Sequence, residues 1–445
     1  MRRPPRPPAR HDRRTRRAPP RRRPPLHLRT HSRRVALRGR TEAPAPGHGV
    51  RWRAPGPLPS ERPPRMAPVR YPRGMSAPSP FMQEAIRLAA SVRGRTSPNP
   101  WVGAVLVRDG QVISRGATAP YGGPHAEAAA LAGVDARGAT LYCTLEPCVP
   151  FEGKRTPPCS DAIIQAGVAR VVVALLDPHV GGPGVQRLRD AGIDVTIGDG
   201  AEAVTDLLRP YLKWRQLGLP YVIAKFAVSL DGAVGAPSAG VTWLTGEAAI
   251  ERAHRDRDWV DAILVGSGTI LADDPALTAR PGGQPAARQP VRVVLDARGR
   301  TSPDSRVFAP GAPVIVATAH GSPPEWREAI VQRGATLLEL DRSSGRLELR
   351  QLLRALGQRN IQSLVVEGGP TVHASFFEAD LVDEVHAYVT PRLLGSAGIP
   401  LVPPGASFPV IYIDPVEIAP LPPDVLIRGY TGSWQPPLPI LASER

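Results

Sequence analysis

The stretch Leu141-Tyr142-Cys143-Thr144-Leu145-Glu146-Pro147-Cys148 decides the fold of the N-terminal half of the chain. Its alternating apolar residues predict a strand over 139–145, and Glu-Pro-Cys then leaves the strand for a loop. Strand-like and helix-like segments alternate around it, with strands at 101–107, 112–116, 170–175 and 193–197 and helices near 81–90 and at 125–131, 160–166, 185–191 and 201–217. Such alternation predicts an α/β layer structure.

A second α/β series follows the short junction Gly218-Leu219-Pro220. It opens with a strand-like segment at 221–228 and continues to about Gly432. Further strand candidates are 262–265, 291–295, 314–317, 363–366, 384–389 and 425–427. No window approaches the run of about 20 apolar residues that crosses a bilayer, so we expect no integral membrane protein.

The basic charge is confined to one end of the chain. Residues 1–75 contain 22 Arg, no Lys and three acidic residues, so the remainder carries −3 although the whole chain carries +16. The Arg/Pro-rich segment has no apolar periodicity and is expected to be disordered. Three alternatives remain for this segment. It is a transit peptide, a nucleic-acid-binding arm, or upstream read-through sequence that precedes a true start at Met66 or Met75. A slightly acidic body argues against a nucleic-acid groove elsewhere.

The three cysteines favour a metal site over a disulfide framework, because Cys143, Cys148 and Cys159 lie in one short stretch. Reduced thiols of this kind indicate a cytoplasmic protein. His125, Cys148 and Cys159 would fill three tetrahedral positions on Zn²⁺ and leave the fourth for water, which is typical of a catalytic site. Cys143 as a fourth ligand would close that site, but the strand alternation predicts that it is a small core residue.

Glu127 is the candidate general acid and base. Bound zinc lowers the pKa of water from about 15.7 towards 7. Glu127 lies two residues beyond His125 and cannot point in the same direction along a regular helix. We therefore expect its carboxylate to face the substrate and to carry the water's proton to a ring nitrogen and the departing amine.

Two motifs in the second half point to a phosphate-bearing ligand. The strand at 225–230 runs into Asp231-Gly232, where an acidic group expected to be buried is interpreted as functional; an ordinary Asp-Gly turn is the alternative. Gly368-Gly369 separates a strand from a helix that begins with Pro370-Thr371, an arrangement that binds phosphate. The GxGxxG fingerprint followed by an acidic residue is absent, so a dinucleotide fold other than the Rossmann fold is implied.

The motifs HAE, TLEPC and RTPPC, preceded by SPNPWVGAVLV, resemble the deaminase domain of the bifunctional riboflavin-biosynthesis deaminase/reductase family. The resemblance implies that Asn99 contacts the substrate. Two segments depart from the family pattern: residues 149–155 lack a usual His and are longer, and residues 177–184 are shorter. Lys154 and Arg155 are expected to supply phosphate contacts instead.

Residues 221–432 resemble the reductase domain of the same family, which has a dihydrofolate-reductase-like fold. The resemblance implies a catalytic Asp231. It implies that NADPH is held by Ala227, Trp243, Thr269, Asp273, Gly369, Pro370, Thr371, Val372, His373, Ala374 and Ser375. It implies that the ribosyl phosphate substrate is held by Arg257, Leu277, Arg280 and Glu367. Val241 and Ala297 stand where the family usually has serines.

The sequence therefore predicts a disordered extension over 1–75, a cytidine-deaminase-like three-layer α/β/α domain over 78–217 and a dihydrofolate-reductase-like α/β domain over 220–432. The expected protein is a cytoplasmic enzyme that uses Zn²⁺ and NADPH and forms a homo-oligomer through its reductase domain. It would deaminate 2,5-diamino-6-(5-phosphoribosylamino)pyrimidin-4-one and then reduce the ribosyl to a ribityl side chain.

Two other hypotheses remain at this stage. The first is a deaminase that acts on RNA, with the Arg-rich segment as its nucleic-acid arm and the C-terminal half as an accessory domain. An acidic body and 5% aromatic residues argue against it. The second is a zinc-binding protein whose reductase half is inactive, which predicts zinc without NADPH oxidation.

Overall fold

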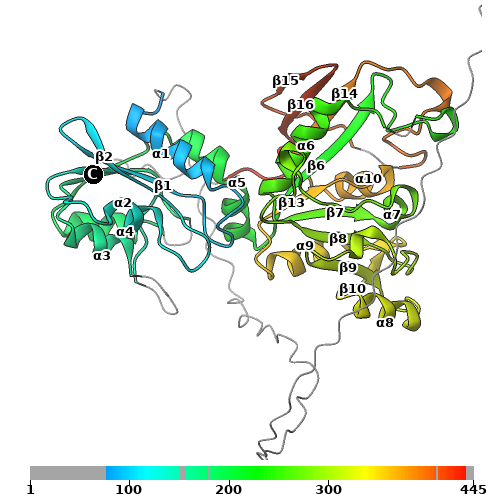
Figure 1. The fold of residues 1–445 in the computed structure, drawn as a ribbon, viewed down its shortest axis with the longest axis horizontal. Coiled ribbons are helices and arrows are strands. Elements are labelled where there is room, and N and C mark those ends of the chain that lie inside the picture. Colours follow the sequence, from blue (N-terminus) through cyan, green and yellow to red (C-terminus); the bar gives the residue numbers. More distant parts are fainter. Residues whose placement is uncertain (1–76, 151–156, 179–180, 242, 407–408, 437–445) are drawn as a thin grey trace, which may run out of the picture. The chain divides into compact units, whose positions relative to one another are not determined.

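The computed structural model describes residues 77–436 except 151–156, 179–180, 242 and 407–408. The Arg/Pro-rich extension and the expected phosphate contacts of Lys154 and Arg155 lie outside the described residues. Two large sheets and a two-stranded ribbon make up the described strands (Figure 1). Within the described residues, no helix combines the length and the apolar character that a bilayer crossing requires.

The first sheet has five strands in the order β2-β1-β3-β4-β5. These are β1 (Gly103–Arg108), β2 (Gln111–Ala117), β3 (Thr140–Leu145), β4 (Arg170–Leu175) and β5 (Asp194–Ile197). β1 runs antiparallel to β2 and β3, whereas β3, β4 and β5 are parallel. Val105, Leu141 and Val173 are fully buried in this sheet. The carboxyl ends of β3 and β4 therefore meet at one edge, where the Glu-Pro-Cys loop begins.

Helices cover both faces of the first sheet (Figure 1). α1 and α5 contact each other and the central strands, and α3 contacts both α2 and α4. The five helices are α1 (Pro80–Ser91), α2 (Ala126–Leu131), α3 (Cys159–Gln165), α4 (Pro183–Asp190) and α5 (Ala201–Leu217). The result is a three-layer arrangement, as the alternation of elements predicted.

Gly116 sets how closely α2 approaches the sheet. A β-carbon at Gly116 would lie 2.0 Å from the Ala126 carbonyl oxygen, which only glycine avoids. α2 consequently lies directly against β2 and places His125, the residue before the helix, at a fixed position.

The second sheet has nine strands in the order β10-β9-β8-β7-β13-β6-β14-β16-β15. They are β6 (Tyr221–Ser229), β7 (Ala262–Gly266), β8 (Val291–Leu295), β9 (Val314–Ala319), β10 (Thr336–Leu340), β13 (Ser363–Val366), β14 (Glu384–Thr390), β15 (Glu417–Leu421) and β16 (Asp424–Tyr430). All neighbours from β10 to β14 are parallel, and β16 and β15 extend the sheet in antiparallel fashion. Ligands of such sheets bind beyond the carboxyl ends of the parallel strands.

The helices of this half connect the parallel strands. They are α6 (Glu247–Trp259), α7 (Ser267–Asp273), α8 (Pro324–Gln332), α9 (Leu349–Gly357) and α10 (Pro370–Glu378). Leu352, Leu356 and Phe376 bury their side chains completely, together with Leu264 and Val293 of the sheet. The ribbon β11 (Arg342–Ser343) and β12 (Arg346–Leu347) precedes α9.

The predicted strands are confirmed where the sequence is strongly apolar. The segment at 363–366 is β13, and every residue of it is buried. β10 and β15 were not predicted, because half-exposed Thr336–Leu340 and the Pro-containing Glu417–Leu421 lie at the sheet edges and lack a continuous apolar run. β1 begins two residues later than predicted, at Gly103.

The buried carboxylate of Glu146 fixes the loop that follows β4. Its oxygens accept hydrogen bonds from the backbone N–H groups of Asp177 (3.1 Å), Gly182 (3.1 Å), Gly184 (2.7 Å) and Val185 (3.3 Å). Burial raises the pKa of Glu146, and the N–H donors oppose that shift. One side chain at the end of β3 thus holds the start of α4.

Replacement of Glu146 by alanine should destabilise the fold. Glu146→Ala leaves several buried N–H groups without an acceptor, so we expect the free energy of unfolding to fall by about 3 kcal/mol. Chemical denaturation of the full chain measures this change. Glu202→Ala, an exposed position on α5, is the matched control. Equal midpoints for the two variants would contradict the role assigned to Glu146.

Candidate functional site

Three predicted metal ligands meet at the carboxyl edge of the first sheet. The Nδ1 atom of His125 lies 3.5 Å from the Sγ atom of Cys148 and 3.5 Å from that of Cys159. The ligand atoms of all three residues lie within 4.8 Å of one another. One imidazole and two thiols at these separations fit a tetrahedral Zn²⁺ ion with one position left open.

Each ligand is held by the end of a secondary-structure element. His125 is the N-cap of α2, Cys148 follows β3 by three residues, and Cys159 is the first residue of α3. The backbone N–H of Cys159 donates to the Cys148 Sγ at 3.3 Å, and that of Ser160 donates to the Cys148 carbonyl at 3.1 Å. Such N–H donors and the helix dipole favour the thiolate form that binds metal.

Glu127 lies inside the first turn of α2 and is only 3% exposed. Burial raises the pKa of its carboxyl group to about 7, and the neighbouring Cys148 adds to the shift. A carboxyl group with this pKa exchanges protons readily near neutral pH. Its position next to the three ligands suits a proton carrier.

Cys143 is not part of the metal cluster. It is fully buried in β3, and its Sγ atom lies 3.8 Å from the Val172 carbonyl oxygen of the adjacent strand. Burial raises the pKa of its thiol well above the ordinary value. The prediction that Cys143 is a core residue is confirmed, so it does not close the fourth metal position.

Asn99 lies in the loop that leads into β1. Its backbone N–H donates to the Thr96 carbonyl at 2.9 Å, and its carbonyl accepts from the Thr96 hydroxyl at 2.8 Å. Gly103, at the start of β1, donates its N–H to the Thr144 hydroxyl at 3.1 Å. The Asn99 loop therefore lies at the same edge of the sheet as the end of β3, which leads to Cys148.

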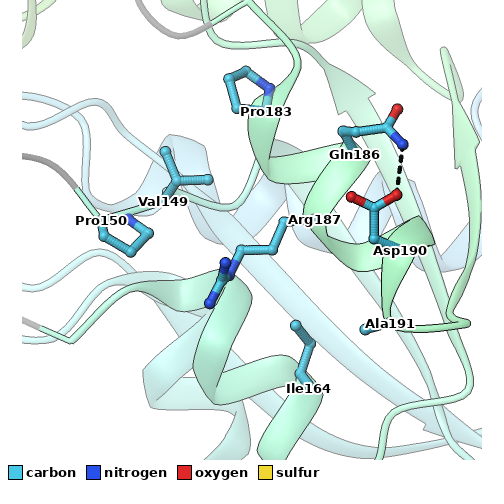
Figure 2. Close-up of a pocket in the computed structure, with 8 residues that line it drawn as sticks. All are labelled: Val149, Pro150, Ile164, Pro183, Gln186, Arg187, Asp190 and Ala191. Carbon is cyan, nitrogen blue, oxygen red and sulfur yellow. Dashed lines mark hydrogen bonds between the residues drawn. The ribbon is translucent and has the colours of Figure 1, made fainter.

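An open surface pocket of about 570 Å³ lies between α3 and α4 (Figure 2). Val149 and Pro150, which directly follow Cys148, form part of its wall. The remaining lining residues are Ile164, Pro183, Gln186, Arg187, Asp190 and Ala191. Its polar groups already pair within the protein, since Arg187 donates to Asp161 at 2.5 Å and Gln186 to Asp190 at 2.8 Å. No metal ligand lines this pocket.

In the second half, predicted substrate residues form a buried ion cluster. Arg257 donates to both carboxylate oxygens of Glu367, from Nε at 2.8 Å and from Nη2 at 2.7 Å. Lys225 Nζ lies 3.7 Å from the same carboxylate. Burial acts to raise the pKa of Glu367, but the two cations outweigh it and lower this pKa to about 2. The carboxylate is therefore ionised throughout the physiological range.

Arg280 and Leu277 adjoin this cluster. Arg257 also donates from Nη1 to the Thr278 carbonyl at 3.1 Å. Thr278 lies between Leu277 and Arg280 in the sequence. The Arg280 backbone N–H donates to His254 Nδ1 at 3.3 Å. Burial and the nearby arginines lower the pKa of His254, so this imidazole is neutral at pH 7. The buried Leu277 has a φ of +49°, a conformation that costs energy for a leucine and fixes the bend here.

Several of the predicted cofactor residues lie where β7 and β13 end. A β-carbon at Gly369, the N-cap of α10, would lie 3.8 Å from the Thr269 hydroxyl of α7, and a β-carbon at Gly368 would lie 2.7 Å from Val372. His373 is buried and packs edge-on against Phe226 of β6, with ring centroids 5.4 Å apart. Burial lowers the pKa of His373 to about 4. Ala227 follows Phe226 on β6, and Asp273 ends α7.

Asp231 and Trp243 lie on the surface. The expectation that Asp231 is buried is wrong, because the turn after β6 exposes its side chain. The Asp231 carboxylate accepts from the Ser229 hydroxyl at 2.5 Å and from the Leu394 and Gly395 N–H groups at 3.0 and 2.7 Å. These hydrogen bonds, above all the one from the Ser229 hydroxyl, lower the pKa of the Asp231 carboxyl group to about 2. Trp243 is 74% exposed.

The sequence did not reveal Lys225, a member of the ion cluster, or His254, which contacts Arg280. Lys225 is one of only three lysines in the chain, against 53 arginines, and lies inside an apolar strand. That unusual position was the available signal. His254 gives no signal of its own, because only the fold brings α6 next to Arg280.

Comparisons with known proteins agree with this geometry. Residues 75–175 match the family described as the cytidine and deoxycytidylate deaminase zinc-binding region, and residues 220–427 match the RibD C-terminal domain. The riboflavin biosynthesis protein RibD of Bacillus amyloliquefaciens is 40% identical over 333 residues, which cover 74% of this chain and 88% of that protein. RibD of Escherichia coli K12 is 41% identical over 330 residues, covering 71% and 88%.

Solved structures show the same relationship. RibD of Acinetobacter baumannii has a TM-score of 0.70 at 36% identity, covering 79% of this chain and 97% of that one. A diaminohydroxyphosphoribosylaminopyrimidine deaminase/5-amino-6-(5-phosphoribosylamino)uracil reductase from Thermotoga maritima has a TM-score of 0.67 at 35% identity, with the same coverage. The predicted α/β class, with a cytidine-deaminase-like and a reductase fold, is confirmed. The chain belongs to the RibD family of bifunctional riboflavin-biosynthesis deaminase/reductases.

Proposed function

We propose that the chain catalyses two consecutive steps of riboflavin biosynthesis. The first is the hydrolytic deamination of 2,5-diamino-6-(5-phosphoribosylamino)pyrimidin-4-one, and the second is the NADPH-dependent reduction of the ribosyl to a ribityl side chain. One observation carries the proposal: His125, Cys148 and Cys159 bring their ligand atoms within 4.8 Å of one another, and Glu127 lies buried two residues from the first ligand. The relatives of this family support the same pair of activities.

In the deamination, Glu127 moves the protons. His125, Cys148 and Cys159 would hold Zn²⁺, which when bound would supply the Lewis acidity that lowers the pKa of water. The Glu127 carboxylate accepts one proton from the attacking water and delivers it to the ring nitrogen. It then carries the second proton, from the hydroxyl of the tetrahedral adduct, to the amine as the C–N bond breaks and ammonia leaves. The burial of Glu127 keeps bulk water from competing for that proton. Asn99 is proposed to orient the pyrimidine ring.

In the reduction, the chain aligns two ligands. NADPH, when bound, would supply a hydride to the C1′ carbon of the imine that forms when the ribosylamine ring opens, and a proton taken up by the imine nitrogen would complete the ribitylamine. The predicted residues on β6, α7 and α10 would bind the cofactor, and Glu367 with Arg257 would hold the ribosyl group. Arg257 already pairs with Glu367, so Arg280 is the better placed of the two arginines for the substrate phosphate. Asp231 is proposed to act by fixing the turn at 394–395 beside β6.

The organisation of the chain remains part of the proposal. We assign deamination to residues 78–217 and reduction to residues 220–432, and we place the enzyme in the cytoplasm because its cysteines act as thiols.

Association of copies through the reductase domain is supported by exposed apolar side chains near the edge strand β15. These include Val410, Tyr412 and Ile418, which are 85%, 83% and 65% exposed.

Replacement of Glu127 should separate metal binding from catalysis. We expect Glu127→Gln to keep one zinc per chain and to lower the rate of ammonia release by about 10²- to 10⁴-fold, because glutamine cannot carry the proton. Metal analysis and an ammonia assay measure the two properties. Glu202→Gln, exposed on α5, should behave as wild type. Ammonia release by Glu127→Gln at the wild-type rate would refute the proton-carrier role.

Removal of zinc should affect only one of the activities. After chelation we expect ammonia release to fall to background, while reduction of separately deaminated substrate stays within about twofold, since NADPH chemistry needs no metal. Among the described residues, the candidate metal cluster is formed by His125, Cys148 and Cys159 alone. Added Zn²⁺ should restore deamination. A parallel loss of NADPH oxidation would count against separate sites.

Replacement of Asp231 should have the opposite selectivity. Asp231→Asn replaces the carboxylate that accepts hydrogen bonds from Ser229, Leu394 and Gly395 with a neutral amide. We therefore expect slower reduction and unchanged deamination. NADPH oxidation and ammonia release, measured on the same preparation, test this. Asp341→Asn, exposed beyond β10, is the control. Normal reduction by Asp231→Asn would remove Asp231 from the proposal.

A further inference from the structure

The backbone next to Asn99 is held by one hydrogen bond from each half of the chain. The Asn99 N–H donates to the Thr96 carbonyl at 2.9 Å, which fixes one side of the peptide bond between Pro98 and Asn99. The Pro98 carbonyl oxygen, on the other side of that bond, accepts from the Nε2 atom of Gln362 at 2.6 Å. Because a peptide bond is planar, the direction of the Asn99 backbone depends on a residue of the second half.

Gln362 is itself fixed where it precedes β13. It is only 1% exposed, and its backbone N–H donates to the Asp261 carboxylate at 2.9 Å. Its carbonyl accepts from the N–H of Tyr221, the first residue of β6, at 2.7 Å. Asp261 directly precedes β7, and β13 pairs with both β6 and β7. The large sheet therefore holds the Gln362 amide in one place.

The end of α6 also contacts the loop between α1 and β1, residues 92–102. A β-carbon at Gly94, whose φ is +75°, would lie 2.5 Å from the Trp259 Cα atom, so only glycine allows this approach. The Trp259 ring packs edge-on against the buried Trp101, with ring centroids 6.0 Å apart. Arg95 Nη2 pairs with the Asp258 carboxylate at 2.6 Å. The second half thus contacts this loop near both of its ends.

Asn99 carries the amide that would contact the pyrimidine ring, and the orientation of that ring decides how closely its reacting carbon approaches the attacking water. Loss of a buried donor leaves the carbonyl that it served without a partner, so the loop would populate other conformations. We propose that Gln362 is a positioning residue for the deamination, which holds the Asn99 loop ready for the substrate although it belongs to the reductase half. This inference rests on the proposed deaminase function and on the proposed contact of Asn99 with the ring.

Steady-state kinetics of the full-length zinc-loaded protein with the diaminopyrimidinone substrate would test this role. Gln362→Met keeps the length of the side chain but removes the donor. We expect it to raise the KM for ammonia release by about fivefold to tenfold and to leave kcat within about twofold, because substrate binding changes whereas proton transfer by Glu127 does not. Gln362→Asn, whose amide is one carbon too short for Pro98, should act in the same direction and keeps a polar group at this buried site. Gln358→Met, exposed after α9, should match wild type.

Two further measurements separate positioning from a general loss of structure. Zinc content and the reduction of separately deaminated substrate should stay within about twofold of wild type in both Gln362 variants, since neither the metal ligands nor the contacts of Glu367 change. Hydrogen exchange of the peptide that covers residues 92–102 should become faster, because the Asn99 loop has lost one of its hydrogen bonds.

Several outcomes would contradict this role of Gln362. An unchanged KM in both Gln362 variants would overturn the inference whatever the hydrogen exchange shows, and so would a fall in kcat alone. Equal losses of deamination and reduction would show a general structural role. A wild type that releases no ammonia would refute the proposed deaminase function, and hydrogen exchange would then decide by itself whether Gln362 holds the loop.

Discussion

The deaminase half depends on one constraint, which is that an imidazole nitrogen and two sulfur atoms lie close enough together to bind a single metal ion. His125, Cys148 and Cys159 belong to three segments, and each stands at the end of an element whose position the sheet dictates. The order β2-β1-β3-β4-β5 aligns the carboxyl ends of β3 and β4, and the close contact of Gly116 with Ala126 holds α2 against the sheet. Packing of these elements thus brings the three candidate ligand atoms within 4.8 Å of one another.

Buried carboxylates organise the loops of both halves. Glu146 gathers the N–H groups that follow β4, and Asp296 gathers those that follow β8. Glu367, by contrast, is balanced by Arg257 and Lys225 and stays ionised in a buried setting. A buried carboxylate must satisfy its oxygens within the protein, so its N–H donors fix the backbone around it. In this way loops that lack regular structure hold side chains precisely at the sheet edges.

The two halves reach their ligands by the same physical means. Both place reactive or charged side chains beyond the carboxyl ends of parallel strands, where helices begin and their N–H groups face outward. Cys159 opens α3, and Pro370 opens α10 after two glycines. The proposed chemistry differs because one half offers an imidazole and two thiols suited to a metal ion, whereas the other offers backbone N–H groups after Gly368 and Gly369, where we propose that the dinucleotide binds.

The sequence by itself determined the apolar strands and identified His125, Cys148, Cys159 and Glu127 as candidate site residues, because short motifs and periodicity are local properties of a chain. β13 was predicted at its exact bounds, whereas edge strands β10 and β15 were not, since partial exposure removes their apolar pattern. Only the tertiary structure placed Asp231 at the surface, joined Lys225 to Glu367 and brought Gln362 to Pro98. Ion pairs and burial depend on residues far apart in the chain, and their energies arise only when folding excludes water from around them.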